Sequence, residues 1–130
     1  MERIDINTEH DVVLARTAAR EISGEQGFSV MTKTRVATAV SELARNVFLH
    51  GEGGYMEYEI IRHTSKVGIR CVFIDDGPGI PDIDQAMEDG FSSIATLGHG
   101  LPGARRLVDE FDIKTGKQGR GLMVEIIKWN

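Results

Sequence analysis

Three glycines in residues 97–107, LGHGLPGARRL, limit the folds open to this chain more than any other feature. Glycines at 98, 100 and 103 give the spacing G-x-G-x-x-G. In a dinucleotide-binding fold this spacing follows a buried parallel strand, and an acidic residue comes about 20 positions later. Here the preceding residues, EDGFSSIATL, are mostly small and polar, and residues 118–123, QGRGLM, contain no acid. The chain is therefore expected neither to form that fold nor to bind NAD.

The order of the expected elements excludes a repeated βαβ winding. Helix and strand patterns alternate without a linker or a repeat, which favours one domain over residues 1–130. In chain order we expect a strand (3–6), helices (8–22 and 31–49), a hairpin (55–63 and 66–75), a short helix (82–89), a flexible segment (90–99), a helix (101–109) and two strands (111–115 and 122–129). This order predicts an α/β (α+β) two-layer sandwich, with a mixed β-sheet covered on one face by helices.

Composition narrows the class of protein further. The net charge of −5 argues against nucleic-acid binding, which depends on Lys and Arg facing phosphates. No apolar run is long enough to span a membrane, and the first residues, MERIDINTEH, do not resemble a signal peptide. Cys71 is the only cysteine, which fits a reducing cytoplasm, and its place on an apolar strand face predicts a core residue.

The glycines of residues 98–103 still have a physical use. A glycine-rich segment that leads into a helix lets the backbone approach a phosphate, and the free N–H groups of a helix start favour an anion. Gly98, Gly100 and Gly103, with His99 and Leu101 between them, are therefore candidates for a phosphate loop. The alternative is a plain surface turn before a helix, and these residues alone do not decide between the two.

A second glycine cluster, DDGPG at 75–79, follows an apolar strand. A carboxylate at Asp75 could accept a hydrogen bond from the exocyclic amine of adenine. Guanine presents a carbonyl there, and that mismatch would discriminate strongly between the bases. Gly77 and Gly79 would keep side chains away from the base. Taken singly, the same residues also fit an acidic turn.

Two polar residues of the second expected helix form the third feature. Its apolar residues at 36, 40, 43 and 47 form one stripe, and Glu42 and Asn46, four residues apart, lie together on a flank of that stripe. A carboxylate beside an amide oxygen can serve as a general base and a Mg²⁺ ligand, because Mg²⁺ takes few protein oxygens and fills its remaining positions with water and phosphate. A solvated polar flank is the alternative.

Taken in chain order, with Glu42 and Asn46 first, DDGPG second and the glycines of 98–103 last, the three features resemble the GHKL (Bergerat) ATP-binding superfamily. SELARNVFLH resembles its N box, DDGPGI its first glycine box and GHGLPG its second. Over nearly the whole length, and most specifically over residues 75–111, the chain resembles the RsbT-type switch serine/threonine kinases of the stressosome. The resemblance implies ATP and Mg²⁺ as cofactors.

The resemblance also implies a role for each matching residue. Glu42 matches the general base, Asn46 the magnesium ligand and Asp75 the adenine-reading acid. Gly77 and Gly79 match the first glycine box, and the segment from Gly98 to Gly103 matches the phosphate loop. One departure concerns the last strand, which in this superfamily usually begins G-x-G-T, whereas here GRGL places Leu122 at the threonine position.

The implied partners are STAS-domain proteins of the RsbS and RsbR type. They would be phosphorylated on serine or threonine and would also sequester the kinase, which would then activate a downstream phosphatase or cyclase. The rival function is an anti-sigma-type binding protein that uses ATP to sequester a partner with little catalysis. An ATPase with water as nucleophile is a third possibility, although such enzymes usually carry further domains.

Overall fold

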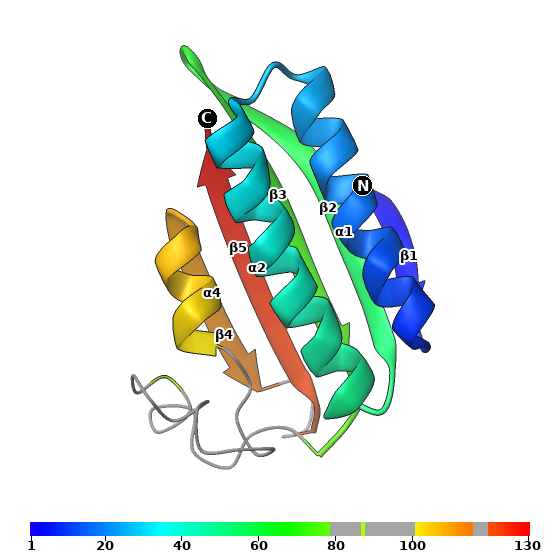
Figure 1. Cartoon of the computed structure of the whole chain (residues 1–130). Helices are drawn as coiled ribbons and strands as arrows, with labels where there is room; N and C mark the ends of the chain where they lie inside the picture. The colour runs from blue at the N-terminus through cyan, green and yellow to red at the C-terminus, as the bar shows by residue number, and fades with distance from the viewer. Residues whose placement is uncertain (79–86, 88–100, 116–119) are drawn as a thin grey trace.

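The computed structural model describes residues 1–78, 87, 101–115 and 120–130 of the chain. They form two layers, with a five-stranded sheet on one side and three helices on the other (Figure 1). The short helix expected at 82–89 and the flexible segment at 90–99 lie outside the described residues, apart from Met87. The two-layer sandwich expected from the sequence is confirmed.

The sheet has the strand order β1-β2-β3-β5-β4. In chain order the strands are β1 (Glu2–Ile6), β2 (Gly54–His63), β3 (Lys66–Asp75), β4 (Glu110–Thr115) and β5 (Leu122–Trp129). Every neighbouring pair of these strands is antiparallel, so the expectation of a mixed sheet was wrong in this respect. β3 and β4 run in the same direction, but β5 lies between them and is antiparallel to both.

Helix α1 (Glu9–Glu25) begins at a capping box. The Thr8 side chain accepts a hydrogen bond from the backbone N–H of Asp11, while the Asp11 carboxylate accepts one from the backbone N–H of Thr8. This reciprocal pair satisfies two N–H groups that a helix start otherwise leaves without partners. Helix α2 (Val30–Leu49) begins in a similar way, at Ser29, whose side chain accepts from the backbone N–H of Thr32.

Helix α4 (Leu101–Leu107) is shorter than the expected 101–109. Asp109 is hydrogen-bonded to strand β5 instead. Its backbone N–H donates to the carbonyl of Ile127 at 3.0 Å, and its carboxylate accepts from the backbone N–H of Trp129 at 2.7 Å. The helix therefore ends two residues early because the sheet takes the hydrogen bonds that would continue it.

The core lies between the sheet and the helices. It contains the apolar stripe of α2 and alternate residues of β3, including Ile69, Cys71 and Phe73. Burial raises the pKa of the Cys71 thiol to about 12, so the thiol stays protonated and unreactive, as expected of a core cysteine. No described element covers the opposite face of the sheet, where Arg70 bridges Glu59 and Glu125.

Several segments that are far apart in the sequence meet at one end of the molecule. The C-terminal end of α2, the end of β3, the start of α4 and the start of β5 all lie there (Figure 1). α2 packs against α4, and β3 pairs with β5 in a register that sets Asp75 opposite Leu122. This arrangement brings parts of all three sequence features to one end of the sheet.

Candidate functional site

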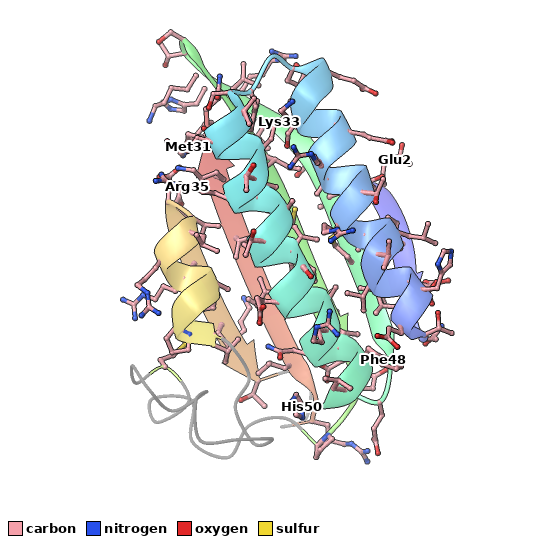
Figure 2. All side chains as sticks on the ribbon, in the orientation of Figure 1. Glu2, Met31, Lys33, Arg35, Phe48 and His50 are labelled. Carbon is pink, nitrogen blue, oxygen red and sulfur yellow. The ribbon has the colours of Figure 1, made fainter. Side chains whose placement is uncertain are left out.

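Glu42 and Asn46 lie one turn apart on α2, as the helical spacing predicts. The side chain of Glu42 is exposed, whereas Asn46 is partly buried. The backbone carbonyl of Asn46 accepts from the N–H groups of His50 at 2.9 Å and Gly51 at 3.0 Å, which closes the end of α2. His50 and Phe48 mark that end of the helix (Figure 2).

The amide nitrogen of the Asn46 side chain is buried and has no hydrogen-bond partner among the described residues. A buried amide without a partner costs free energy, and such groups are rare in native proteins unless a ligand or water completes them. The buried, unpaired N–H group of the Asn46 side chain is therefore available to donate a hydrogen bond to a ligand.

Asp75, the last residue of β3, is a buried carboxylate, with 7% of its surface exposed. Its Oδ1 accepts a hydrogen bond from the backbone N–H of Gly77 at 3.0 Å. Burial raises the pKa of Asp75 above its ordinary value, while the hydrogen bonds from the backbone of Gly77 and Leu122 oppose that rise. The protein thus holds an acceptor carboxylate in a fixed position with little access to water.

Three glycines let the backbone pack closely around Asp75. A Cβ added to Gly51 would lie 2.5 Å from Cγ of Asp75, and one added to Gly77 would lie 2.7 Å from Cα of Gly51. Gly121 has φ of +73°, its added Cβ would lie 2.1 Å from the carbonyl oxygen of Asp75, and its N–H donates to the carbonyl of Gly77 at 2.8 Å. We call Gly51, Gly77 and Gly121 the glycine cradle of Asp75.

The sequence features revealed only part of this cradle. Gly77 was expected as part of the first glycine box, but Gly51 and Gly121 were not among the candidate residues. Nothing in their spacing indicates contact with Asp75, because that contact depends on how the end of α2 and the start of β5 meet β3. The tertiary fold gives both glycines their role.

At the start of α4, Leu101 is fully buried, and Gly103 lies inside the helix. No described atom lies within 4 Å of a Cβ added at Gly103, so packing against the described residues does not require a glycine there. The other candidates of the two glycine boxes, Gly79, Gly98, His99 and Gly100, lie outside the described residues. Their roles remain predictions.

Leu122 stands where related sequences are expected to carry a threonine. Its side chain is buried in the core, with 6% of its surface exposed, and its backbone N–H is one of the two that bond the carboxylate of Asp75. The backbone at this position therefore supports Asp75 even though the hydroxyl of a threonine is missing.

The described residues suit the polar groups of an adenine nucleotide. Asp75 is an acceptor for an amine, and the buried amide nitrogen of Asn46, near the end of α2, has no partner among the described residues and is a donor for an acceptor oxygen such as that of a phosphate. Among the described residues, no three of His, Cys, Asp or Glu gather to hold a metal ion. A Mg²⁺ ion bound mainly by phosphate and water, with one amide oxygen from the protein, needs no such cluster.

Comparison with known proteins assigns the family. The family model of the histidine kinase-like ATPase domain matches residues 7–128. Serine/threonine-protein kinase RsbT of Bacillus subtilis (strain 168) is 44% identical over 97% of this chain and 94% of its own length. The chain belongs to the RsbT group of the histidine kinase-like ATPase family.

More distant relatives of the RsbT group agree with this assignment. The anti-sigma F factor of Thermoanaerobacter sp. (strain X514) is 26% identical over 88% of this chain and 82% of its own length. Among solved structures, the catalytic domain of histidine kinase ThkA has a TM-score of 0.52 at 14% identity, covering 98% of this chain and 95% of its own. A blue-light activated histidine kinase domain from Erythrobacter litoralis has a TM-score of 0.50 at 22% identity, and the match covers 92% of this chain and 59% of the other.

These structural matches confirm the GHKL fold that the RsbT resemblance implies. Among the described residues, no helix is long and apolar enough to cross a membrane.

Replacing Asp75 with Asn should stabilise the nucleotide-free protein and weaken ATP binding. Because its pKa is raised, Asp75 stabilises the native state while it is protonated, and that contribution is lost as the pH rises through the native pKa. Asn keeps an acceptor oxygen for the Gly77 N–H without the buried charge, so the melting temperature at neutral pH should rise. The rise should be smaller in acid, because Asp75 is then protonated and carries no charge either. ATP affinity by calorimetry should fall roughly tenfold or more, the value of a hydrogen bond to a charged group. Unchanged affinity would count against the adenine contact.

Replacing Gly51 with Ala should cost both stability and nucleotide affinity, because the new methyl would have to displace Asp75. Overpacking of this kind costs about 1–3 kcal/mol. The matched control is Gly24→Ala in α1, where the nearest atom to an added Cβ is Cδ of Lys33 at 3.5 Å. Urea denaturation should show Gly51→Ala destabilised and Gly24→Ala equal to the parent protein or more stable. Equal stability of the two variants would show that the cradle tolerates a side chain.

Proposed function

We propose that this chain is an ATP-dependent serine/threonine protein kinase that phosphorylates STAS-domain partners of the RsbS and RsbR type. The observation that carries the proposal is the 44% identity to a serine/threonine kinase over 97% of the chain. At one end of the sheet, the buried Asp75 and the side-chain nitrogen of Asn46, which has no partner among the described residues, support it. By the same similarity, the kinase acts in the cytoplasm, is sequestered in the stressosome and, once released, activates a downstream phosphatase or cyclase.

Each of three residues at this end of the fold has a separate role in the proposed phosphoryl transfer. Bound ATP with Mg²⁺ supplies the γ-phosphoryl group and leaves as ADP. Asp75 would orient the nucleotide by accepting a hydrogen bond from the adenine amine, and the side-chain oxygen of Asn46 would hold Mg²⁺. Glu42 accepts the proton of the serine or threonine hydroxyl, whose oxygen forms the new bond to phosphorus as the bond to ADP breaks. General-base assistance of this kind contributes roughly 10²–10⁴-fold to the rate.

The second glycine box completes the proposed site. Gly98, His99 and Gly100, with Leu101 and Gly103 at the start of α4, would bring backbone N–H groups to the phosphates, and Gly77 with Gly79 would keep the base pocket free of side chains. Most catalysis in such sites comes from positioning and charge neutralisation. The exposed Glu42 leaves access for a protein hydroxyl from solvent.

The rival function is an anti-sigma-type binding protein that uses the same nucleotide site to hold a partner with little catalysis. The similarity to anti-sigma F factor supports it. Incubation with γ-³²P-labelled ATP and a purified RsbS-type STAS protein separates the two. A kinase transfers label to the partner, whereas a binding protein forms a nucleotide-dependent complex that carries no label.

Replacing Glu42 with Gln should abolish phosphorylation and leave ATP affinity nearly unchanged. Gln keeps the shape of the side chain but cannot accept the hydroxyl proton. We expect a loss of 10²-fold or more in kcat, on the order of general-base catalysis. Label transfer measures the rate and calorimetry the affinity. Glu25→Gln, which changes another exposed glutamate of the helical layer, is the control. Full activity of the Glu42 variant would remove this residue from the mechanism.

Replacing Gly103 with Ala should stabilise the fold and impair nucleotide binding. Ala favours a helix interior by about 1 kcal/mol over Gly, and no described atom opposes a methyl at this position. Thermal unfolding should show a higher melting temperature. If the backbone at Gly103 contacts the phosphates, calorimetry should also show weaker ATP binding. Retained affinity would mean that Gly103 plays no part in the phosphate loop.

A further inference from the structure

The outer edge of β2 is only half covered by β1 (Figure 1). β1 pairs with residues 54–58 of β2, with Glu2 opposite Tyr58, whereas β2 continues to His63. On its other side, β2 pairs with β3 along its whole length. Within the part of the chain that the structure describes, no strand pairs with the outer edge of residues 59–63. We call this stretch the open edge of β2.

The backbone groups of Ile60 and Arg62 point outward along the open edge. In β3, the carbonyl of Val67 accepts from the N–H of the residue that follows β5, so Val67 points toward β5. Because successive residues of a strand alternate in direction, Gly68 points toward β2 and bonds to Ile61, which lies opposite it. Ile60 and Arg62, on either side of Ile61, therefore turn their N–H and C=O groups outward. None of these groups has a backbone partner among the described residues, and such a row is a template for a further strand.

The side chains near the open edge are mostly acidic on the helical side of the sheet. Glu2 shares that side with Tyr58 and lies at the edge of the molecule, beside α1 (Figure 2). Burial raises the pKa of the Tyr58 hydroxyl, and the charges of Glu2, Glu21 and Glu25 raise it further, so all three carboxylates are near this ring. Against them stands Arg62, whose guanidinium already donates to the side chain of the α1 C-cap residue at 2.7 Å.

We propose that the open edge of β2 binds an extended segment of a partner protein that carries a basic side chain. The segment forms a short strand in line with β1 and antiparallel to β2, and it bonds to the outward groups of Ile60 and Arg62. Directly opposed residues of neighbouring strands point to the same face of a sheet. The partner's residue opposite Ile60 therefore points to the helical side, where a lysine or arginine meets the carboxylates. The backbone bonds supply affinity and the basic side chain supplies specificity.

A second copy of this chain is a poorer occupant of the open edge. Pairing of two such edges would bring Glu2, Glu21 and Glu25 of both copies together, and facing like charges destabilise a strand pair. A basic segment meets the opposite charge instead. Charge complementarity therefore favours a different protein.

The open edge lies away from the nucleotide end of the fold. Gly54 is the residue of β2 opposite Asp75, and Ile60 follows six residues later. At about 3.3 Å per residue, the two positions are roughly 20 Å apart along the strand. The proposed binding is thus separate from the kinase function and does not depend on it.

The first test uses short, end-blocked, fluorescent peptides and the parent protein. A peptide in which lysine and valine alternate should bind saturably in an anisotropy titration, and its counterpart with glutamate in place of lysine should bind at least tenfold more weakly. In the proposed pairing, the lysine N–H groups face β2 and the valine N–H groups face away. N-methylation of the lysine residues should therefore weaken binding at least tenfold, whereas N-methylation of the valine residues, the matched control, should change it less than twofold.

Charge reversals in the protein test the acidic side of the open edge. The combination of Glu2→Lys and Glu21→Lys should weaken binding of the lysine–valine peptide at least tenfold. The matched control is Asp112→Lys, which changes an exposed carboxylate of β4, at the opposite edge of the sheet, and should leave the affinity unchanged. ATP affinity by calorimetry should be the same in all these proteins.

Hydrogen exchange followed by NMR locates the bound peptide. The N–H groups of Ile60 and Arg62 should exchange at least tenfold more slowly with peptide bound, whereas that of Ile61, already bonded to β3, should not change. Equal binding of the two N-methylated peptides would reduce the effect to charge attraction and overturn the proposal. Unchanged exchange at Ile60 and Arg62, or no saturable binding, would overturn it as well. Protection of the same groups on raising the protein concentration without peptide would identify a second copy as the occupant and refute a basic partner.

Discussion

The burial of one carboxylate, Asp75, is the constraint around which this end of the molecule is organised. A charged group away from water is costly unless hydrogen bonds compensate it, and among the described residues the compensation comes from backbone N–H groups. Those groups belong to the residue two positions later and to the first residue of β5, so the carboxylate depends on the pairing of β3 with β5. The glycine cradle follows from the same constraint, because any side chain at Gly51 would occupy the space of the carboxylate.

The cradle also connects two parts of the proposed chemistry. Gly51 closes the end of α2 by donating to the carbonyl of Asn46, and it touches Asp75 with its own backbone. The helix that carries Glu42 and Asn46 therefore cannot shift relative to Asp75 without opening a packed backbone contact. Such a rigid connection suits phosphoryl transfer, in which positioning of the phosphate relative to the acceptor supplies much of the rate.

Local patterns predicted most of the fold, and the tertiary contacts account for what they missed. The apolar stripe of α2 and the alternation in β3 located both elements to within a residue of their observed bounds, because their periodicity is uninterrupted. The end of α4 was misplaced, since Asp109 bonds to β5, which is distant in sequence. Asp75 was found from its motif, but Gly51 and Gly121 were not: their role exists only where three separate segments meet. Gly79, Gly98, His99 and Gly100 lie outside the described residues and stay predictions.

The position of β5 has a consequence for how the protein is made. Although β5 is the last element in chain order, it occupies the inner place between β3 and β4 and supplies a backbone donor to Asp75. While the ribosome still holds residues 122–129, β3 has a free edge and the carboxylate lacks one of its two supports. Residues 2–75 contain α1, α2 and the first three strands, but the surroundings of Asp75 are complete only when β5 has paired with β3. The surroundings of Asp75 thus depend on a segment that is far from it in the sequence.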